Sequence, residues 1–137
     1  MIPSARDVST YDQKPEMSAI EIADAVIDEI QQNHPDLVIV NFANGDMVGH
    51  TGNLPAAIAA VETVDQCVGR VVETTLAAGG SLIVTADHGN CEQMIDPTSG
   101  GPHTAHTTFD VPLSMVDSQW QQVPLVARGG LEGLAPS

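Results

Sequence analysis

The fold class follows from two short runs, LVIVNF at residues 37–42 and SLIVTA at residues 81–86. Both are nearly continuous aliphatic stretches rich in β-branched residues, a pattern typical of strands that are covered on both faces in a parallel or mixed sheet. A third strand is expected at residues 111–116, and a weaker fourth at residues 123–127. We expect the first three strands to lie side by side.

Helical patterns alternate with these runs. Apolar residues recur at helical spacing over residues 20–30, after Ser18 and Glu21, which match a capping box. Pro35 follows the expected end of this helix. A longer helix with its own apolar stripe is expected over about residues 55–78. The order helix, strand, helix, strand, loop, strand predicts an α/β layered fold.

The charge of the chain argues against two classes of partner. Lys and Arg total 4 against 18 Asp and Glu, which gives a formal net charge of −14. Such a surface repels nucleic acid and anionic membranes, so neither is expected as a partner. It also suits an anionic substrate poorly, unless metal ions or another part of the protein supply positive charge.

The cysteines and the length of the apolar runs indicate the compartment. Cys67 and Cys91 form no CxxC pair, and we expect two reduced thiols. No segment approaches the roughly 18 apolar residues of a membrane span, and no charged N-terminal region leads into an apolar run. The composition therefore predicts a cytoplasmic, globular protein of one domain.

Chemistry-bearing residues gather in three clusters, all in expected loops. The clusters are Asp46 with His50, Asp87 with His88, and His103 with His106. The first two follow the first two predicted strands, and α/β folds place their sites beyond the carboxyl ends of strands. Carboxylate and imidazole together suit Zn²⁺ or Mn²⁺ better than Ca²⁺ or an iron–sulfur cluster.

Each cluster also has a purely structural interpretation. Asp46 would serve as a loop cap, His50 as a solvated loop residue, and Asp87-His88 as a turn that ends a strand. His103 and His106 would be a chance pair in a polar loop. Three such clusters placed together favour a metal or catalytic site over these separate interpretations.

Five blocks of sequence resemble, in the same order, the cofactor-independent phosphoglycerate mutases of the alkaline phosphatase superfamily. The blocks are TYD at 10–12, KPEMSA at 14–19, NFANGDMVGHTG at 41–52, TADHGN at 85–90 and GPHTAHT at 101–107. They cover nearly the whole chain. The fold that this resemblance implies is a partial alkaline-phosphatase-like three-layer sheet with flanking helices.

The resemblance also implies an activity and its metal ligands. Family members interconvert 2- and 3-phosphoglycerate in glycolysis, through a phosphoserine intermediate and with two divalent ions, expected to be Mn²⁺. Carried over by position, one ion is bound by Asp46, His50 and His106, and the second by Asp87 and His88 together with a serine and another Asp. His103 matches a family position that we do not expect to bind metal. The chain departs from the family at Gly45, where proline is frequent.

The matching part is roughly the last quarter of a family member. Residues 1–137 are therefore expected to be a C-terminal fragment of the metal-binding phosphatase-like domain, with the nucleophile segment and the substrate domain absent. The second metal set is then incomplete, and the chain alone is expected to be inactive. Phosphoglycerate is the expected small-molecule substrate of the whole enzyme, and an exposed sheet edge is expected to favour self-association.

The residues leave two alternatives open. One is another member of the superfamily, namely a phosphatase, a sulfatase or a phosphopentomutase. The other is a metal-binding fragment with no catalytic role. The block at residues 46–52 favours the mutase.

Overall fold

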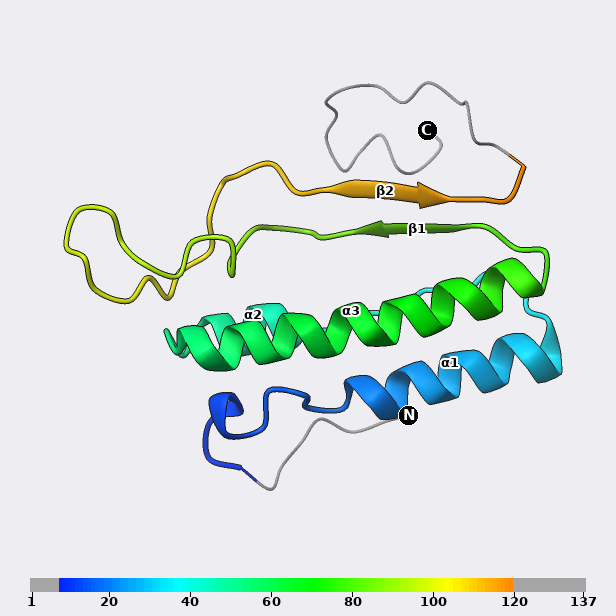
Figure 1. Ribbon diagram of the computed structural model, residues 1–137, viewed down its shortest axis with the longest axis horizontal. Coiled ribbons are helices and arrows are strands. Elements are labelled where there is room, and N and C mark those ends of the chain that lie inside the picture. The colour runs from blue at the N-terminus through cyan, green and yellow to red at the C-terminus, as the bar shows by residue number, and fades with distance from the viewer. Residues whose placement is uncertain (1–7, 120–137) are drawn as a thin grey trace.

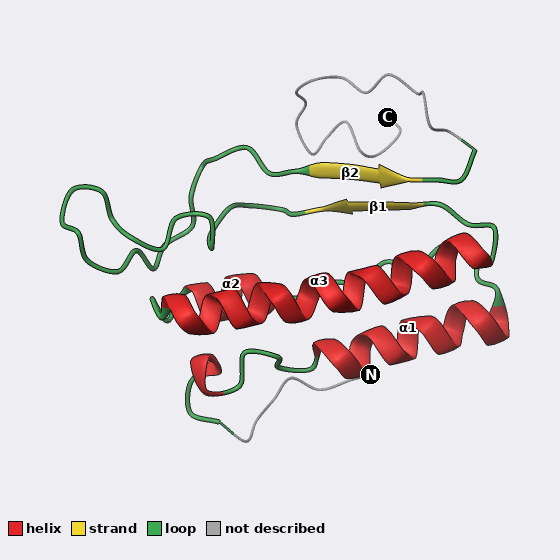
Figure 2. Ribbon diagram, in the orientation of Figure 1, coloured by secondary structure: helices red, strands yellow, loops and turns green. Residues whose placement is uncertain are grey.

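The computed structural model describes residues 8–119, which form a helix layer and a small β layer (Figures 1 and 2). The helix layer holds the long helices α1 (Ala19–Asn33) and α3 (Leu54–Ala77), the short helix α2 (Asn44–Gly49) and a 3-10 turn, η1 (Tyr11–Gln13). The β layer is the pair β1 (Leu82–Thr85) and β2 (Leu113–Val116). The predicted α/β class is confirmed.

The two ends of helix α1 are set by residues in left-handed backbone conformations. It ends where His34 adopts a left-handed conformation with φ of 47°, just before Pro35. The predicted capping box at its start is wrong, because the Ser18 side chain makes no capping hydrogen bond. Met17 is left-handed, and Ala19 N–H donates to Glu16 O at 3.0 Å. The chain thus enters the helix through a tight turn, not through the extended backbone that a capping box requires.

Helix α3 starts at a real cap. The Asn53 side chain accepts a hydrogen bond from Ala56 N–H at 3.2 Å, and Pro55 occupies the first turn, where its missing N–H costs nothing. The helix ends before Gly79, which has φ of 78°. Helices α1 and α3 run in the same direction, joined by an extended return segment (Figure 1).

Small side chains let the helices pack closely. One buried cluster joins α1 to α3 through Ala19, Ala23, Cys67 and Val71. A second joins α2 to the first half of α3, and its members are Met17, Val48, Ala56, Ala57, Ala60 and Met94. The near absence of aromatic residues is consistent with this alanine-rich contact, which brings the helix backbones together.

Strands β1 and β2 pair antiparallel, with Leu82 opposite Val116 and Thr85 opposite Leu113. The strands predicted at residues 81–86 and 111–116 are therefore confirmed, with shorter bounds. Strand β1 is not covered on both faces as predicted, because its residues alternate between half-buried and exposed and Ile83 is 58% exposed. Among residues 8–119 the sheet is an antiparallel pair, not the parallel or mixed sheet that was expected.

The strand predicted at residues 37–42 does not form among the described residues. This segment is extended, but its backbone makes no backbone hydrogen bond to any residue from 8 to 119. Leu37 is 75% exposed and Ile39 is 87% exposed. A strand requires a hydrogen-bonded neighbour, and in the described part of the chain this segment has none. The fourth strand, predicted at residues 123–127, lies outside the described residues.

The expected loop that carries Asp46 and His50 is instead helix α2 followed by a turn. Asn44 begins this helix and is buried; its Nδ2 donates to Pro15 O and Glu16 O, each at 2.8 Å. The amide thereby ties α2 to the segment before α1. Asp46 and His50 consequently stand about one helical turn apart.

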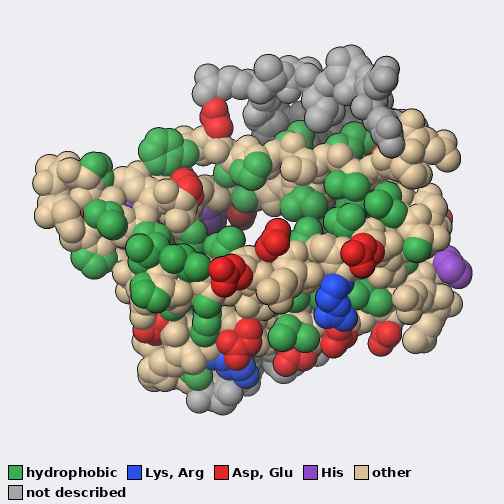
Figure 3. Space-filling view, in the orientation of Figure 1, with side chains coloured by type: hydrophobic (Ala, Val, Ile, Leu, Met, Phe, Trp, Pro, Cys, Tyr) green, Lys and Arg blue, Asp and Glu red, His purple; other side chains and the backbone are tan. Residues whose placement is uncertain are grey.

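Several apolar side chains of α3 and β1 remain exposed. Ile58 and Val61 on α3 are about half exposed, and so is Ile83 on β1. Figure 3 shows hydrophobic side chains gathered between the β pair and α3, where the surface is also hollowed. Of the helices between residues 8 and 119, none is both long and apolar enough to cross a membrane.

The close helix contact generates a prediction about stability. We expect Ala23→Leu to lower the free energy of unfolding by about 1–3 kcal/mol, because Ala23 is fully buried against α3 and a larger side chain overpacks the contact. The matched control is Ala25→Leu, two residues along α1 at an exposed position. Urea unfolding followed by circular dichroism measures both. Equal stability of the two variants would contradict the packing described above.

Candidate metal centre

The predicted site residues come from three separate segments at one end of the molecule. Asp46 lies in α2, and His50 directly follows this helix. Asp87 and His88 lie on the first limb of the long loop between β1 and β2, directly after β1. His106 lies on the second limb of this loop, which leads to β2. An isolated antiparallel bridge between Gly89 and Thr107 holds the last two segments together, with Thr107 N–H donating to Gly89 O at 2.9 Å. This bridge places His88 and His106 next to each other.

Three side-chain atoms form a tight triangle. His50 Nε2 lies 3.1 Å from Asp46 Oδ1, and His106 Nε2 lies 3.0 Å from the same oxygen. The two Nε2 atoms are 3.1 Å apart. The structure thus brings together Asp46, His50 and His106, the set predicted for one ion.

The protonation of His50 shows what this triangle requires. His50 Nδ1 is 2.6 Å from Thr104 O, which can only accept a hydrogen bond, so Nδ1 carries a proton. In the neutral ring, Nε2 is then a lone pair that faces the Asp46 carboxylate and His106 Nε2. If both rings are neutral, the triangle therefore holds at most one proton, on His106 Nε2. One proton cannot bridge all three atoms, so the triangle needs an extra proton or a cation.

The donor spacing fits a metal ion. Two donors that each lie about 2.1 Å from a common ion, at about a right angle, are about 3.0 Å apart. The three distances of 3.0–3.1 Å agree with this value. One carboxylate with two imidazoles suits Mn²⁺, Zn²⁺ or Fe²⁺, and the backbone acceptor on His50 Nδ1 is the outer contact that orients a ligating imidazole.

The electrostatics keep Asp46 ionised. Burial by itself raises the pKa of Asp46, but the hydrogen bond from Asn90 and the neighbouring His50, His106 and His88 outweigh it, so the pKa is lowered. A carboxyl group with a lowered pKa carries its charge at neutral pH and is ready to bind a cation.

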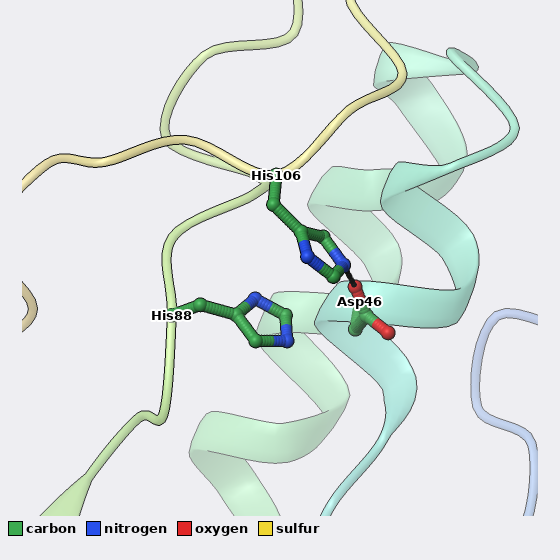
Figure 4. Close-up of side chains that lie close together, drawn as sticks. All are labelled: Asp46, His88 and His106. Carbon is green, nitrogen blue, oxygen red and sulfur yellow. Dashed lines mark hydrogen bonds and ion pairs between the residues drawn. The ribbon is translucent and has the colours of Figure 1, made fainter.

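His88 lies beside the triangle, whereas Asp87 is largely exposed. One ligand atom each of Asp46, His88 and His106 lies within 4.8 Å of the others, and Figure 4 shows the His88 ring turned toward Asp46. Its ring is stacked on that of His106, with centroids 3.8 Å apart. Asp87 Oδ1 is 3.7 Å from His88 Nε2, and its side chain is 83% exposed. The assignment of Asp87 and His88 to a second ion stays a prediction.

Two neighbouring polar residues were not predicted to contribute. Asn90 is 5% exposed, and its Nδ2 donates to Asp46 Oδ1 at 2.8 Å and to Asp46 O at 3.3 Å. Glu92 accepts Asn90 N–H at 2.7 Å and also accepts the Thr107 hydroxyl. The sequence placed Asn90 in a turn after Asp87-His88, but nothing in it indicated a partner 44 residues away.

The other residues of the predicted clusters lie outside the triangle. Cys91 Sγ donates to Gly45 O at 2.8 Å, and burial, followed by the charges of Glu92 and Asp46, raises the pKa of this thiol. Cys91 is therefore a protonated, free thiol, which agrees with the expectation of a reduced cysteine. His103 N–H donates to Met94 O at 3.0 Å, and its Nδ1 is buried without a hydrogen-bond partner in the described part of the chain.

Comparisons with known proteins agree with this geometry. A model of the metalloenzyme superfamily matches residues 1–137. The chain is 66% identical to the 2,3-bisphosphoglycerate-independent phosphoglycerate mutase of Rhodopirellula baltica, and 57% identical to that of Syntrophotalea carbinolica. Both matches cover 100% of this chain, but 25% and 26% of those proteins. The chain thus spans about a quarter of the length of these curated relatives.

A solved structure gives the same result. The crystal structure of Leishmania mexicana phosphoglycerate mutase at low cobalt concentration matches with a TM-score of 0.77 and 35% sequence identity. The match covers 85% of this chain and 23% of that one. The resemblance inferred from the five sequence blocks is confirmed. With a family match along its full length and a donor triangle that fits a divalent ion, the chain belongs to the metalloenzyme superfamily.

Proposed function

We propose that this chain is the metal-binding part of a phosphoglycerate mutase that interconverts 2- and 3-phosphoglycerate through a phosphoserine intermediate. The observation that carries the proposal is the triangle of Asp46, His50 and His106, whose three ligand atoms have the spacing expected around one divalent ion. The names of the relatives at 66% and 57% identity support the substrate and the reaction. The proposal includes Mn²⁺ as the metal, glycolysis as the pathway and the cytoplasm as the compartment.

In this proposal Asp46, His50 and His106 bind the first ion, and Asp87 and His88 contribute to the second. The nucleophilic serine, a further Asp and the substrate domain belong to parts of the enzyme outside residues 1–137. Bound ions would neutralise the phosphoryl oxygens during transfer. Asp46 supplies the negative charge of the first site, and Thr104 O holds the His50 ring so that Nε2 faces inward.

The local charges support a role for metal. Arg70 on α3 is paired with Asp24 on α1, so its charge is already matched by a carboxylate. A phosphorylated substrate needs positive charge, and metal ions are the source that we propose. The alternatives are a phosphatase, sulfatase or phosphopentomutase of the same superfamily, and a non-catalytic metal-binding fragment; the mutase is favoured because the curated relatives named above are mutases.

The metal assignment predicts a graded loss of affinity. Loss of an outer contact weakens metal binding by up to about 100-fold. We expect Asp46→Ala to weaken Mn²⁺ binding by more than this, because the substitution removes the charged ligand itself. Asp65→Ala, at an exposed position on α3, is the matched control and should bind as the unaltered chain does. Asp87→Ala should change the affinity little, because the second set is incomplete. Calorimetry measures all three; equal losses in Asp46→Ala and Asp87→Ala would refute the assignment.

The chain of residues 1–137 produced alone is predicted to have no mutase activity, even with saturating Mn²⁺. Loss of a covalent nucleophile in a hydrolase costs about a million-fold in turnover, and no serine here lies in a block that matches the family's nucleophile. An enolase-coupled assay with 3-phosphoglycerate tests this expectation. Turnover that survives purification and disappears in Asp87→Ala would mean that a serine of this chain acts as the nucleophile.

We also propose that the isolated chain self-associates through its exposed extended segment. Leu37 and Ile39 are 75% and 87% exposed, and unpaired extended backbone beside apolar side chains favours pairing with another chain. Sedimentation velocity should show concentration-dependent species larger than the monomer, and Ile39→Lys should shift them toward the monomer. Ile20→Lys, at a 47%-exposed position on α1, is the control. A chain that remains monomeric at every concentration argues against the proposal.

A further inference from the structure

Asn90 holds the oxygen atom around which the triangle is built. Asp46 Oδ1 is the atom that both His50 Nε2 and His106 Nε2 approach, and Asn90 Nδ2 donates to this same oxygen at 2.8 Å. The amide also reaches Asp46 O at 3.3 Å. Asn90 is thus bound to both the side chain and the main chain of the carboxylate residue, and it is 5% exposed.

The chemistry of its neighbours fixes the orientation of the Asn90 amide. Both atoms of Asp46 that face it are acceptors, so only the NH₂ group can lie there. The opposite orientation would set the amide oxygen against a carboxylate and a carbonyl. In the observed orientation Asn90 Oδ1 is buried without a hydrogen-bond partner in the described residues. The orientation that lets Asn90 Nδ2 donate to Asp46 therefore leaves Asn90 Oδ1 without a hydrogen bond among the described residues, which costs free energy.

The surroundings leave Asn90 little freedom to move. A Cβ on Gly49, in α2, would overlap Asn90 Oδ1, so the glycine provides the space for the amide. On the other side, Asn90 N–H donates to Glu92 Oε2 at 2.7 Å, and Glu92 Oε1 accepts the Thr107 hydroxyl. Glu92 thus joins the limb that carries His88 to the limb that carries His106, and Asn90 extends this connection to Asp46.

We propose that Asn90 is a positioning residue, whose amide fixes Asp46 Oδ1 where the two histidines can share a cation with it. This inference rests on the metal centre proposed above. The bond from Asn90 leaves other lone-pair directions of Oδ1 open for a cation, and it stabilises the ionised form of the carboxyl. Outer contacts of this kind orient metal ligands, and their loss weakens metal binding about 10–100-fold.

The test compares two buried asparagines that make similar bonds. Asn90→Ala removes the two bonds to Asp46, whereas Asn44→Ala removes two bonds to Pro15 O and Glu16 O at the start of α2. Both variants should lose stability. Mn²⁺ affinity of the folded protein should fall about 10–100-fold in Asn90→Ala and less than about threefold in Asn44→Ala. The visible absorption spectrum of bound Co²⁺ should change in Asn90→Ala alone, because only this variant displaces a ligand.

Each outcome separates this inference from the proposed function. If Asp46→Ala abolishes binding while Asn90→Ala keeps the affinity and the Co²⁺ spectrum, Asn90 has only a structural role and the inference fails. If Asp46→Ala binds like the unaltered chain, the metal centre itself is misassigned. Should Asn90→Ala not give the native circular dichroism spectrum, Asn90→Leu takes its place, because it keeps the same number and branching of side-chain heavy atoms and removes the donor. Unchanged affinity and spectrum in that variant overturn the inference equally.

Discussion

The arrangement depends on one electrostatic constraint, namely three acceptor atoms held about 3 Å apart. The proton on His50 Nδ1 is donated to Thr104 O, so in the neutral ring Nε2 has no proton and directs its lone pair at Asp46 Oδ1. Within the triangle only His106 Nε2 can carry a proton in a neutral ring, so the contact between Asp46 Oδ1 and His50 Nε2 is repulsive unless an extra proton or a cation lies among the three atoms. The fold must therefore hold the triangle together, and the hydrogen bonds around it contribute to that.

The restraints reach the triangle from several directions. The buried amide of Asn90 donates to Asp46 Oδ1 and to Asp46 O. The bridge between Gly89 and Thr107, reinforced by Glu92, aligns the two loop limbs. Helices α1 and α3 contribute no ligand to the triangle. They form the packed layer against which α2 rests, through buried alanines and Val48.

Much of this arrangement could be predicted from local pattern, and the remainder depends on long-range contacts. Helices α1 and α3 have enough turns for their apolar periodicity to be visible, and β1 and β2 read correctly as short strands. Helix α2 has six residues, too few for periodicity, and glycines at 45 and 49 indicated a loop. The run at residues 37–42 reads as a strand, yet a strand also needs a partner, and none is present among residues 8–119. Asn90 could not be identified because its partner Asp46 is 44 residues away.

The central claim is that Asp46, His50 and His106 bind one divalent ion. Anomalous scattering from crystals of the chain soaked in Mn²⁺ tests it most directly, because the signal locates the ion without reference to activity. The account predicts a peak in contact with Asp46 Oδ1, His50 Nε2 and His106 Nε2, with weaker density or none at Asp87. A dominant peak at Asp87 and His88, or a fully loaded crystal with no peak at Asp46, would contradict it.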